Sequence, residues 1–281
     1  GIIISHNMFE RFPLTPETTA AFIQEQVDTL ERTVKEAKGE HMSKRSISGM
    51  ETRIANLKEK LKDILDTDLD DIGIPFEQLG IDQLFVDEAD MFKNLYYTTS
   101  MDRVSGLAQS NANRSNDMFA KTQWLTRAMG GRGVVFATGT PISNTMAEMY
   151  TMLRYLDMQG LKEKKLDMFD NWIRTFAEVG SGMERKPTGD GFRKVNKVKR
   201  FINMADLNKM FRKVADVKTQ EDLDLDIPKL KNNKPTIVKI KADESLLDYI
   251  KNVVPKRVAD MKKGFKHEKG EDNMLALTND L

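Results

Sequence analysis

The stretch Leu84–Asn94 reads Leu-Phe-Val-Asp-Glu-Ala-Asp-Met-Phe-Lys-Asn. The apolar run from Ile81 to Val86 predicts a buried strand, and it ends abruptly at Asp87-Glu88-Ala89-Asp90. Ligands of open parallel sheets bind at the carboxyl ends of the strands. Two carboxylates at such an end suit phosphate chemistry, because Asp87 can hold Mg²⁺ and Glu88 can orient a water for attack on a γ-phosphate. The same pattern is also typical of an acidic helix N-terminus, which the helix dipole favours.

A second apolar strand is predicted at Val134–Ala137, and it runs directly into Thr138-Gly139-Thr140-Pro141-Ile142-Ser143-Asn144. Glycine and small hydroxyl residues at a strand end let the backbone come close to a neighbour or a ligand. Pro141 ends the strand, and Ser143 or Asn144 can cap the helix that we expect over 144–156. The alternative is an ordinary strand-to-helix turn.

Apolar strands alternate with helical segments along the chain, which indicates an α/β fold with a parallel sheet flanked by helices. Two further strands are predicted at 1–5 and 236–240. From residue 16 to residue 66, apolar residues recur at the three- and four-residue steps of a coiled-coil seam. This spacing predicts an antiparallel helical hairpin, which either docks a partner or nucleic acid or packs on itself as an insertion.

Composition excludes several kinds of site. The 281 residues contain no cysteine, which rules out disulfide scaffolds, thiolate zinc sites and cysteine nucleophiles. The net charge of +1 argues against a wholly basic nucleic-acid coat. No apolar run approaches the about 18–20 residues that span a bilayer, so we expect no membrane partner. The absence of cysteine fits a reducing cytoplasm, which is the expected location. The chain starts inside an apolar run and ends without a stop signal, which predicts a piece of a larger protein.

One segment combines glycines with a high density of cations. Clustered Lys and Arg gain affinity for nucleic acid by releasing counterions from the phosphates. The alternative is a solvated mobile loop. The candidate phosphate contacts are Arg185, Lys186, Arg193, Lys194, Lys197, Lys199 and Arg200.

The two strand-end motifs together resemble those of a known family. Val86–Asn94 resembles motif II, the extended Walker B motif, of the Swi/Snf-related ATPases, a branch of the superfamily-two helicases. Ala137–Asn144, with Glu148 beyond it, is similar to motif III of that family. The resemblance implies a partial RecA-like parallel sheet, ATP and Mg²⁺ as cofactors, and nucleic acid, specifically duplex DNA, as the partner.

The resemblance also implies a role for each motif residue. Asp87 would hold Mg²⁺ and Glu88 would position the hydrolytic water. Lys93 and Asn94 would support the motif II loop. The residues expected to couple nucleotide state to nucleic-acid contact are Asp90, Thr138, Gly139 and Thr140.

The same resemblance suggests how the chain is divided. Residues 1–14 and 80–160 would form part of the first RecA-like lobe, and 15–79 an inserted helical hairpin. Residues 161–233 would be a helical and basic linker, and 234–281 the start of the second lobe. The hairpin is not usual for the family. In this respect the chain resembles large phage and mobile-element polypeptides in which such a helicase follows a DNA methyltransferase domain.

The chain also departs from the family pattern. It contains no Gly-x-x-x-x-Gly-Lys-Ser/Thr phosphate cradle, and it ends before the second lobe could supply an arginine finger. We therefore expect it to be inactive alone and to depend on the rest of its parent polypeptide. The alternatives are an RNA helicase of the Asp-Glu-Ala-Asp class, whose third motif is normally Ser-Ala-Thr, a restriction-type helicase subunit, and a non-catalytic module that binds a partner through the hairpin.

Overall fold

The computed structural model describes residues 1–37, 44–66, 73–101, 104–105, 107, 112–185, 192–219, 222–223, 228, 230, 234–262, 277 and 279. The chain divides into two compact units. The first comprises Gly1–Gly182 and Val195–Asp216, and the second comprises Met183–Lys194 and Val217–Leu281. Both strand-end motifs lie in the first unit.

The first unit is built around a short parallel strand pair. Strand β1 (Leu84–Val86) pairs in parallel with β3 (Val134–Phe136), and Val86 lies opposite Phe136. Gly133 permits this close approach, because its φ is +97° and a Cβ there would lie 2.9 Å from the Asp82 carbonyl oxygen. The prediction of a mixed α/β fold with parallel strands is therefore confirmed for this pair.

Helices pack against this pair and bury two apolar clusters. The first cluster joins Val86 and the 3₁₀ turn η3 (Ala89–Phe92) to Met118 and Phe119 of α4 (Asn113–Ala128). It also includes Phe9 of α1 (His6–Phe9) and Phe76 of the 3₁₀ turn η2 (Phe76–Leu79). Because the Phe76 N–H donates to the Pro13 oxygen at 2.7 Å, the chain returns to this body before residue 80.

The second cluster is centred on Trp172, which is completely buried. Trp172 lies on α7 (Phe169–Phe176) and packs beside Tyr150 of α5 (Ala147–Leu156). Leu161 of α6 (Met158–Glu163) and Leu207 of α8 (Met204–Arg212) complete the cluster. Phe176 is buried as well and lies on the same face of α7, with its ring 5.4 Å from that of Trp172.

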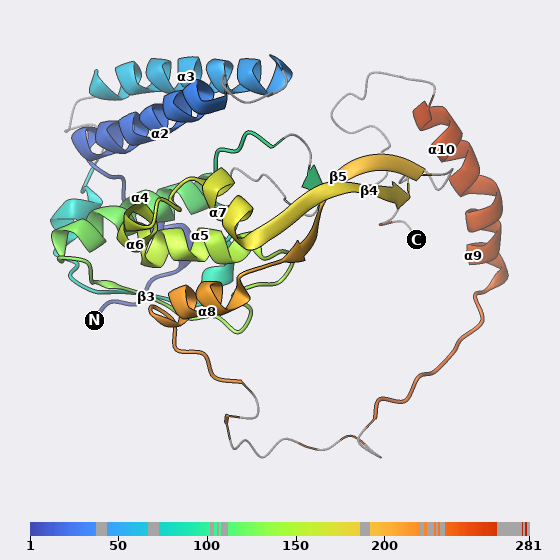
Figure 1. The fold of residues 1–281 in the computed structure, drawn as a ribbon. Helices are drawn as coiled ribbons and strands as arrows, with labels where there is room; N and C mark the ends of the chain where they lie inside the picture. Colours follow the sequence, from blue (N-terminus) through green and yellow to red (C-terminus); the bar gives the residue numbers. More distant parts are fainter. Residues whose placement is uncertain are drawn as a thin grey trace. The chain divides into compact units, whose positions relative to one another are not determined.

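The predicted helical pair is present as α2 (Pro16–Ala37) and α3 (Lys44–Leu65), which lie side by side in Figure 1. Leu30, Val34 and Met50 form its buried seam. Lys58 Nζ of α3 pairs with Glu31 of α2 at 2.7 Å. The pair also rests on the body, since the Phe22 ring packs edge-on against Phe119 of α4 with 5.6 Å between centroids.

Two predicted strands are wrong. Ile2 and Ile3 are almost fully exposed and lie outside any strand, and Ile237 and Val238 at the second site are exposed as well. A β-branched run forms a strand only where another strand accepts its backbone hydrogen bonds. No strand in the described parts of the chain pairs with either segment.

The described residues of the basic segment form strands rather than a loop. Strands β4 (Ala177–Arg185) and β5 (Phe192–Phe201) belong to one sheet with β2 (Val104–Ser105), in the order β2-β5-β4. β2 and β5 are parallel, whereas the ion pairs Glu178–Arg200 and Glu184–Arg193 indicate that β4 and β5 are antiparallel. We call β4 and β5 the ribbon.

The second unit contains a helical segment with a local change of winding. It runs through α9 (Glu244–Asp248), the π-helical turn η5 (Tyr249–Val253) and α10 (Val254–Lys262). Pro255 lacks the N–H that would continue the α-helical pattern. The π-helical turn ends at Val253, two residues before this proline.

Candidate active site

The ends of β1 and β3 bring the two predicted loops together. The Ala137 N–H donates to the Val86 oxygen at 2.8 Å, and the Ala89 N–H donates to the Ala137 oxygen at 3.0 Å. These two bonds continue the parallel ladder one step beyond the strands. Asp87–Asp90 therefore emerges beside Thr138–Thr140 at one edge of the sheet.

The first two acidic residues are exposed, and one has an unusual backbone. Asp87 and Glu88 are both open to solvent, whereas Ala89 is fully buried. Glu88 has φ 51° and ψ 46°, a left-handed conformation that costs a residue with a side chain on the order of 1–2 kcal/mol. Two backbone hydrogen bonds hold this turn: the Ala89 N–H donates to the Ala137 oxygen, and the Met91 N–H donates to the Glu88 backbone oxygen. Strain of this kind is concentrated at functional sites.

A side-chain hydrogen bond joins the two loops. Thr138 Oγ1 donates to Asp90 Oδ1 at 3.0 Å, and the same hydroxyl accepts the Thr140 N–H at 3.1 Å. The structure thus brings Asp90, Thr138 and Thr140 together. Gly139 is exposed, and a Cβ there would meet nothing within 4 Å, so packing does not require glycine at this position.

A second connection runs through Lys93 and Glu148. Lys93 Nζ contacts Ser143 Oγ and lies 3.7 Å from Glu148 Oε1. Glu148 Oε2 accepts the backbone N–H groups of Ser143 at 2.6 Å and Asn144 at 3.3 Å. Asn94 is exposed, and its backbone oxygen accepts the Ala112 N–H at 3.3 Å. Sequence reasoning included Glu148 only as part of motif III and missed its role in ordering both loops.

Mg²⁺ that acts on nucleotides uses one or two carboxylates, together with phosphate oxygens and waters. The exposed carboxylates of Asp87 and Glu88 fit that donor set. Within the described residues, no three or more His, Asp or Glu side chains are grouped so that they could hold a metal ion.

The predicted phosphate contacts differ from one another. Arg193 pairs with Glu184 at 3.6 Å. Arg200 donates two hydrogen bonds of 2.8 Å to Glu178, and these bonds lower the pKa of the Glu178 carboxyl. Arg185 ends β4, and Lys186 lies outside the described residues. The remaining cations, all exposed on β5, are Lys194, Lys197 and Lys199.

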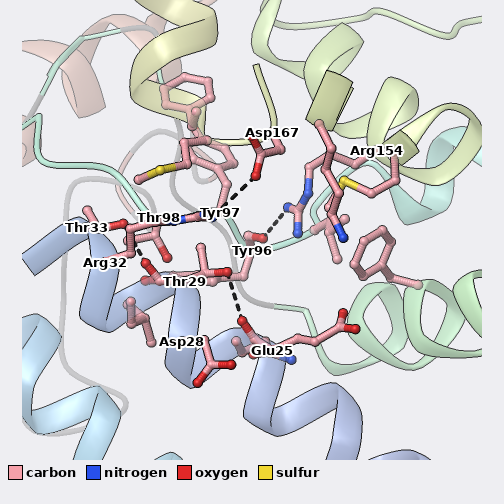
Figure 2. A pocket seen from close by; sticks show the side chains of 18 of the residues that line it. Glu25, Asp28, Thr29, Arg32, Thr33, Tyr96, Tyr97, Thr98, Arg154 and Asp167 are labelled. Carbon is pink, nitrogen blue, oxygen red and sulfur yellow. Dashed lines mark hydrogen bonds and ion pairs between the residues drawn. The ribbon is translucent and has the colours of Figure 1, made fainter. Parts of the chain in front are cut away.

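A separate cavity of about 760 Å³ lies between α2 and the α5–α7 region (Figure 2). Tyr96, Tyr97 and Arg154 line it, and the Arg154 guanidinium donates to the backbone carbonyl oxygen of Tyr96 at 2.6 Å. None of the residues 87–94 or 138–144 lines this cavity. It is therefore distinct from the strand-end site.

Comparison with known proteins identifies the family. Residues 1–219 match a family described as "Probable helicase domain". The chain belongs to this helicase family. The matched range contains β1, β3 and both motif loops, and it also contains α2, α3 and the ribbon.

One relative of this helicase domain is the "Defense against restriction protein B" of Escherichia phage P1. The two are 29% identical over 161 residues, which is 55% of this chain but 7% of the phage protein. The chain thus spans a small part of that relative. No solved structure matches the chain.

None of the helices in the described residues is long and apolar enough to cross a membrane.

Proposed function

We propose that this helicase domain carries the Mg-ATP hydrolysis motifs of a DNA-dependent translocase related to the Swi/Snf ATPases. The observation that supports the proposal best is the hydrogen bond of 3.0 Å between Thr138 and Asp90. It connects the ends of two adjacent parallel strands, which is where α/β proteins bind their ligands. Membership of a helicase family supports ATP and Mg²⁺ as cofactors and nucleic acid as the partner.

Each residue has a distinct task in this proposal. Bound Mg²⁺ would neutralise charge on the phosphates during phosphoryl transfer. The Asp87 carboxylate holds the metal, and the Glu88 carboxylate orients the attacking water and accepts its proton. Asp90 and Thr138 link the nucleotide loop to the Thr138–Thr140 turn. Lys93 and Glu148 hold Ser143 and Asn144 in place, so that the two loops shift as one unit.

The finer features of the proposal concern the parent polypeptide. The phosphate cradle and the arginine finger come from other parts of it, because the chain lacks the Gly-x-x-x-x-Gly-Lys-Ser/Thr pattern. Residues 1–14 and 80–160 contribute to a first RecA-like lobe, 15–79 is an inserted hairpin, 161–233 is a linker, and 234–281 begins a second lobe. The isolated chain does not turn over ATP, and the parent is a phage or mobile-element protein that works in the cytoplasm.

The test is ATP turnover by the protein in its natural full length, measured alone, with duplex DNA and with single-stranded RNA. Glu88→Gln should lower turnover by about 10²–10⁴-fold, because the water loses its base, while ATP binding persists. The matched control is Glu163→Gln, an exposed glutamate at the end of α6, which should leave turnover unchanged.

Each other outcome favours another function. Turnover that survives in Glu88→Gln removes Glu88 from the water-positioning role. Stimulation by RNA alone favours an RNA helicase. Absence of turnover under every condition favours a non-catalytic module that binds its partner through α2 and α3.

A further inference from the structure

The ribbon carries two lysines whose direction is set by glycines on the neighbouring strand. A Cβ on Gly180 would lie 2.5 Å from Lys199 Cε and 2.7 Å from its Nζ. A Cβ on Gly182 would lie 2.5 Å from Lys197 Cε. Both lysine stems therefore lie flat across β4, in the space that the glycines leave free. Residues with ordinary side chains at 180 and 182 would displace them.

These two lysines differ from Arg193 and Arg200 of the ribbon in their partners. Arg193 and Arg200 are held by Glu184 and Glu178. In the described part of the chain, neither the Lys197 nor the Lys199 side chain has a hydrogen bond or an ion pair, although Lys199 contributes to the lowered pKa of Glu178. Both are exposed. Their ammonium groups are thus oriented by packing and remain available to an external anion.

The part of β5 that carries these lysines is firmly attached to the rest of the first unit. Val198 and Phe201 pack against the apolar cluster around Trp172, and the Ile202 N–H donates to the Phe176 oxygen at 2.8 Å. β2 pairs with β5 at Asn196 and Lys197. A charged pair on such a support loses little conformational entropy when it binds, which favours affinity.

We propose that Lys197 and Lys199 bind successive phosphates of a nucleic-acid strand, with Gly180 and Gly182 orienting them. This inference rests on the proposed function, because it identifies where the nucleic-acid partner makes contact. Residues two apart on a strand are separated by about 6.6 Å, so the two cations repeat along the ribbon as phosphates repeat along a nucleic-acid backbone. Arg193 and Arg200 are structural, and their charges are already neutralised.

The experiment measures binding of the natural full-length protein to a labelled duplex DNA over a series of salt concentrations, without ATP. Lys197→Gln/Lys199→Gln should reduce the slope of log affinity against log salt by about two, and affinity at 0.1 M salt by about 10- to 100-fold. The control is Lys162→Gln/Lys164→Gln, which removes the same charge from two exposed lysines at the end of α6. The control variant should leave both the salt slope and the affinity nearly unchanged.

A second variant separates orientation from charge. Gly180→Ala/Gly182→Ala keeps both lysines but pushes their stems off β4, and it should weaken binding about tenfold. Alanine is more favourable than glycine inside a strand, so thermal unfolding should show a fold at least as stable as the native one. A loss of binding in this variant cannot then come from unfolding.

The outcomes distinguish this inference from the proposed function. Equal losses in the ribbon and control variants would overturn it, because binding would then depend on total charge. Binding that no ribbon variant affects, or capture of an acidic protein but no nucleic acid, would also overturn it. Substituting single-stranded RNA for duplex DNA shows which polymer supplies the phosphates. Because ATP is absent, failure of Glu88 as a catalytic residue leaves this test intact.

Discussion

Lys93 and Glu148 form an ion pair, with 3.7 Å between Nζ and Oε1, that ties the loop after β1 to the first turn of α5. Both side chains are largely withdrawn from water, at 16% and 9% exposure. The other carboxylate oxygen of Glu148 accepts the N–H groups of Ser143 and Asn144. One buried glutamate therefore orders the loop that follows β3 and holds it against the loop that follows β1.

Removal of Glu148 should destabilise the domain. Glu148→Ala leaves the Lys93 ammonium without its counter-charge and two backbone amides without their acceptor, so we expect the free energy of unfolding to fall by about 3 kcal/mol. Glu148→Gln keeps an acceptor for the amides and should cost less. Urea unfolding measures both, with Glu163→Gln as a surface control expected to stay within about 0.5 kcal/mol of the native protein. An unchanged midpoint in Glu148→Ala would refute this role.

Thr138→Val should break the connection between the loops while keeping the shape of the side chain. Loss of the hydrogen bond to Asp90 should lower the free energy of unfolding by about 1 kcal/mol. If the loops couple nucleotide and nucleic acid, stimulation of ATP turnover by duplex DNA should fall more than basal turnover. Thr138→Ser keeps the hydroxyl and should preserve stimulation. Equal behaviour of the two variants would show that the hydroxyl is not needed.

The backbone of Glu88 predicts a difference between two truncations. Glycine adopts the left-handed conformation freely and alanine does not, so Glu88→Gly should be about 1 kcal/mol more stable than Glu88→Ala. At Asp87, which is not among the residues with positive φ, alanine should be the more stable of the two. Denaturant unfolding of the four variants makes this comparison. The same preference at both positions would show that Glu88 is not strained.

Buried tyrosines predict a loss of stability at high pH. Burial, together with the charge of Asp170, raises the pKa of Tyr97 to about 12 from its ordinary value of 10.0. Because the raised pKa belongs to the folded state, its stabilising contribution is complete below pH 10 and is lost as the pH rises towards 12. A shift of this size corresponds to about 2–3 kcal/mol.

The measurement is the free energy of unfolding between pH 9 and pH 12, compared with Tyr97→Phe. The variant should lose less stability over that range, because one of the raised pKa values is gone. Burial also raises the pKa of Tyr150 and Tyr155, so part of the decline should remain. Identical slopes for the variant and the native protein would show that Tyr97 does not ionise on unfolding in this range.

Several features of the site were predictable because they depend on local patterns. Short apolar runs that end at Asp87 and Thr138 predicted the two strands and the position of both loops. The three- and four-residue spacing of Leu30 and Val34 predicted the face on which α2 packs. In each case a single segment of the chain contains the whole signal.

Other features depended on segments that are distant in the sequence. Ile2 and Ile3 have strong strand propensity, yet they stay exposed because no described strand pairs with them. The alternating glycines of β4 carry no apolar period, so its pairing with β5 and the seating of Lys197 over Gly182 could not be predicted from either segment.

The sequence by itself determined the two strand-end motifs, the amphipathic helices and the absence of cysteine chemistry. Only the tertiary structure decided the left-handed turn at Glu88, the function of Glu148 and the burial of Lys121. The Lys121 ammonium is fully buried, yet it donates to the Phe9 oxygen at 2.9 Å and to Asp117 at 2.7 Å. The physical reason is common to all three: a buried charge or a strained turn is stable only when partners from other parts of the chain satisfy it.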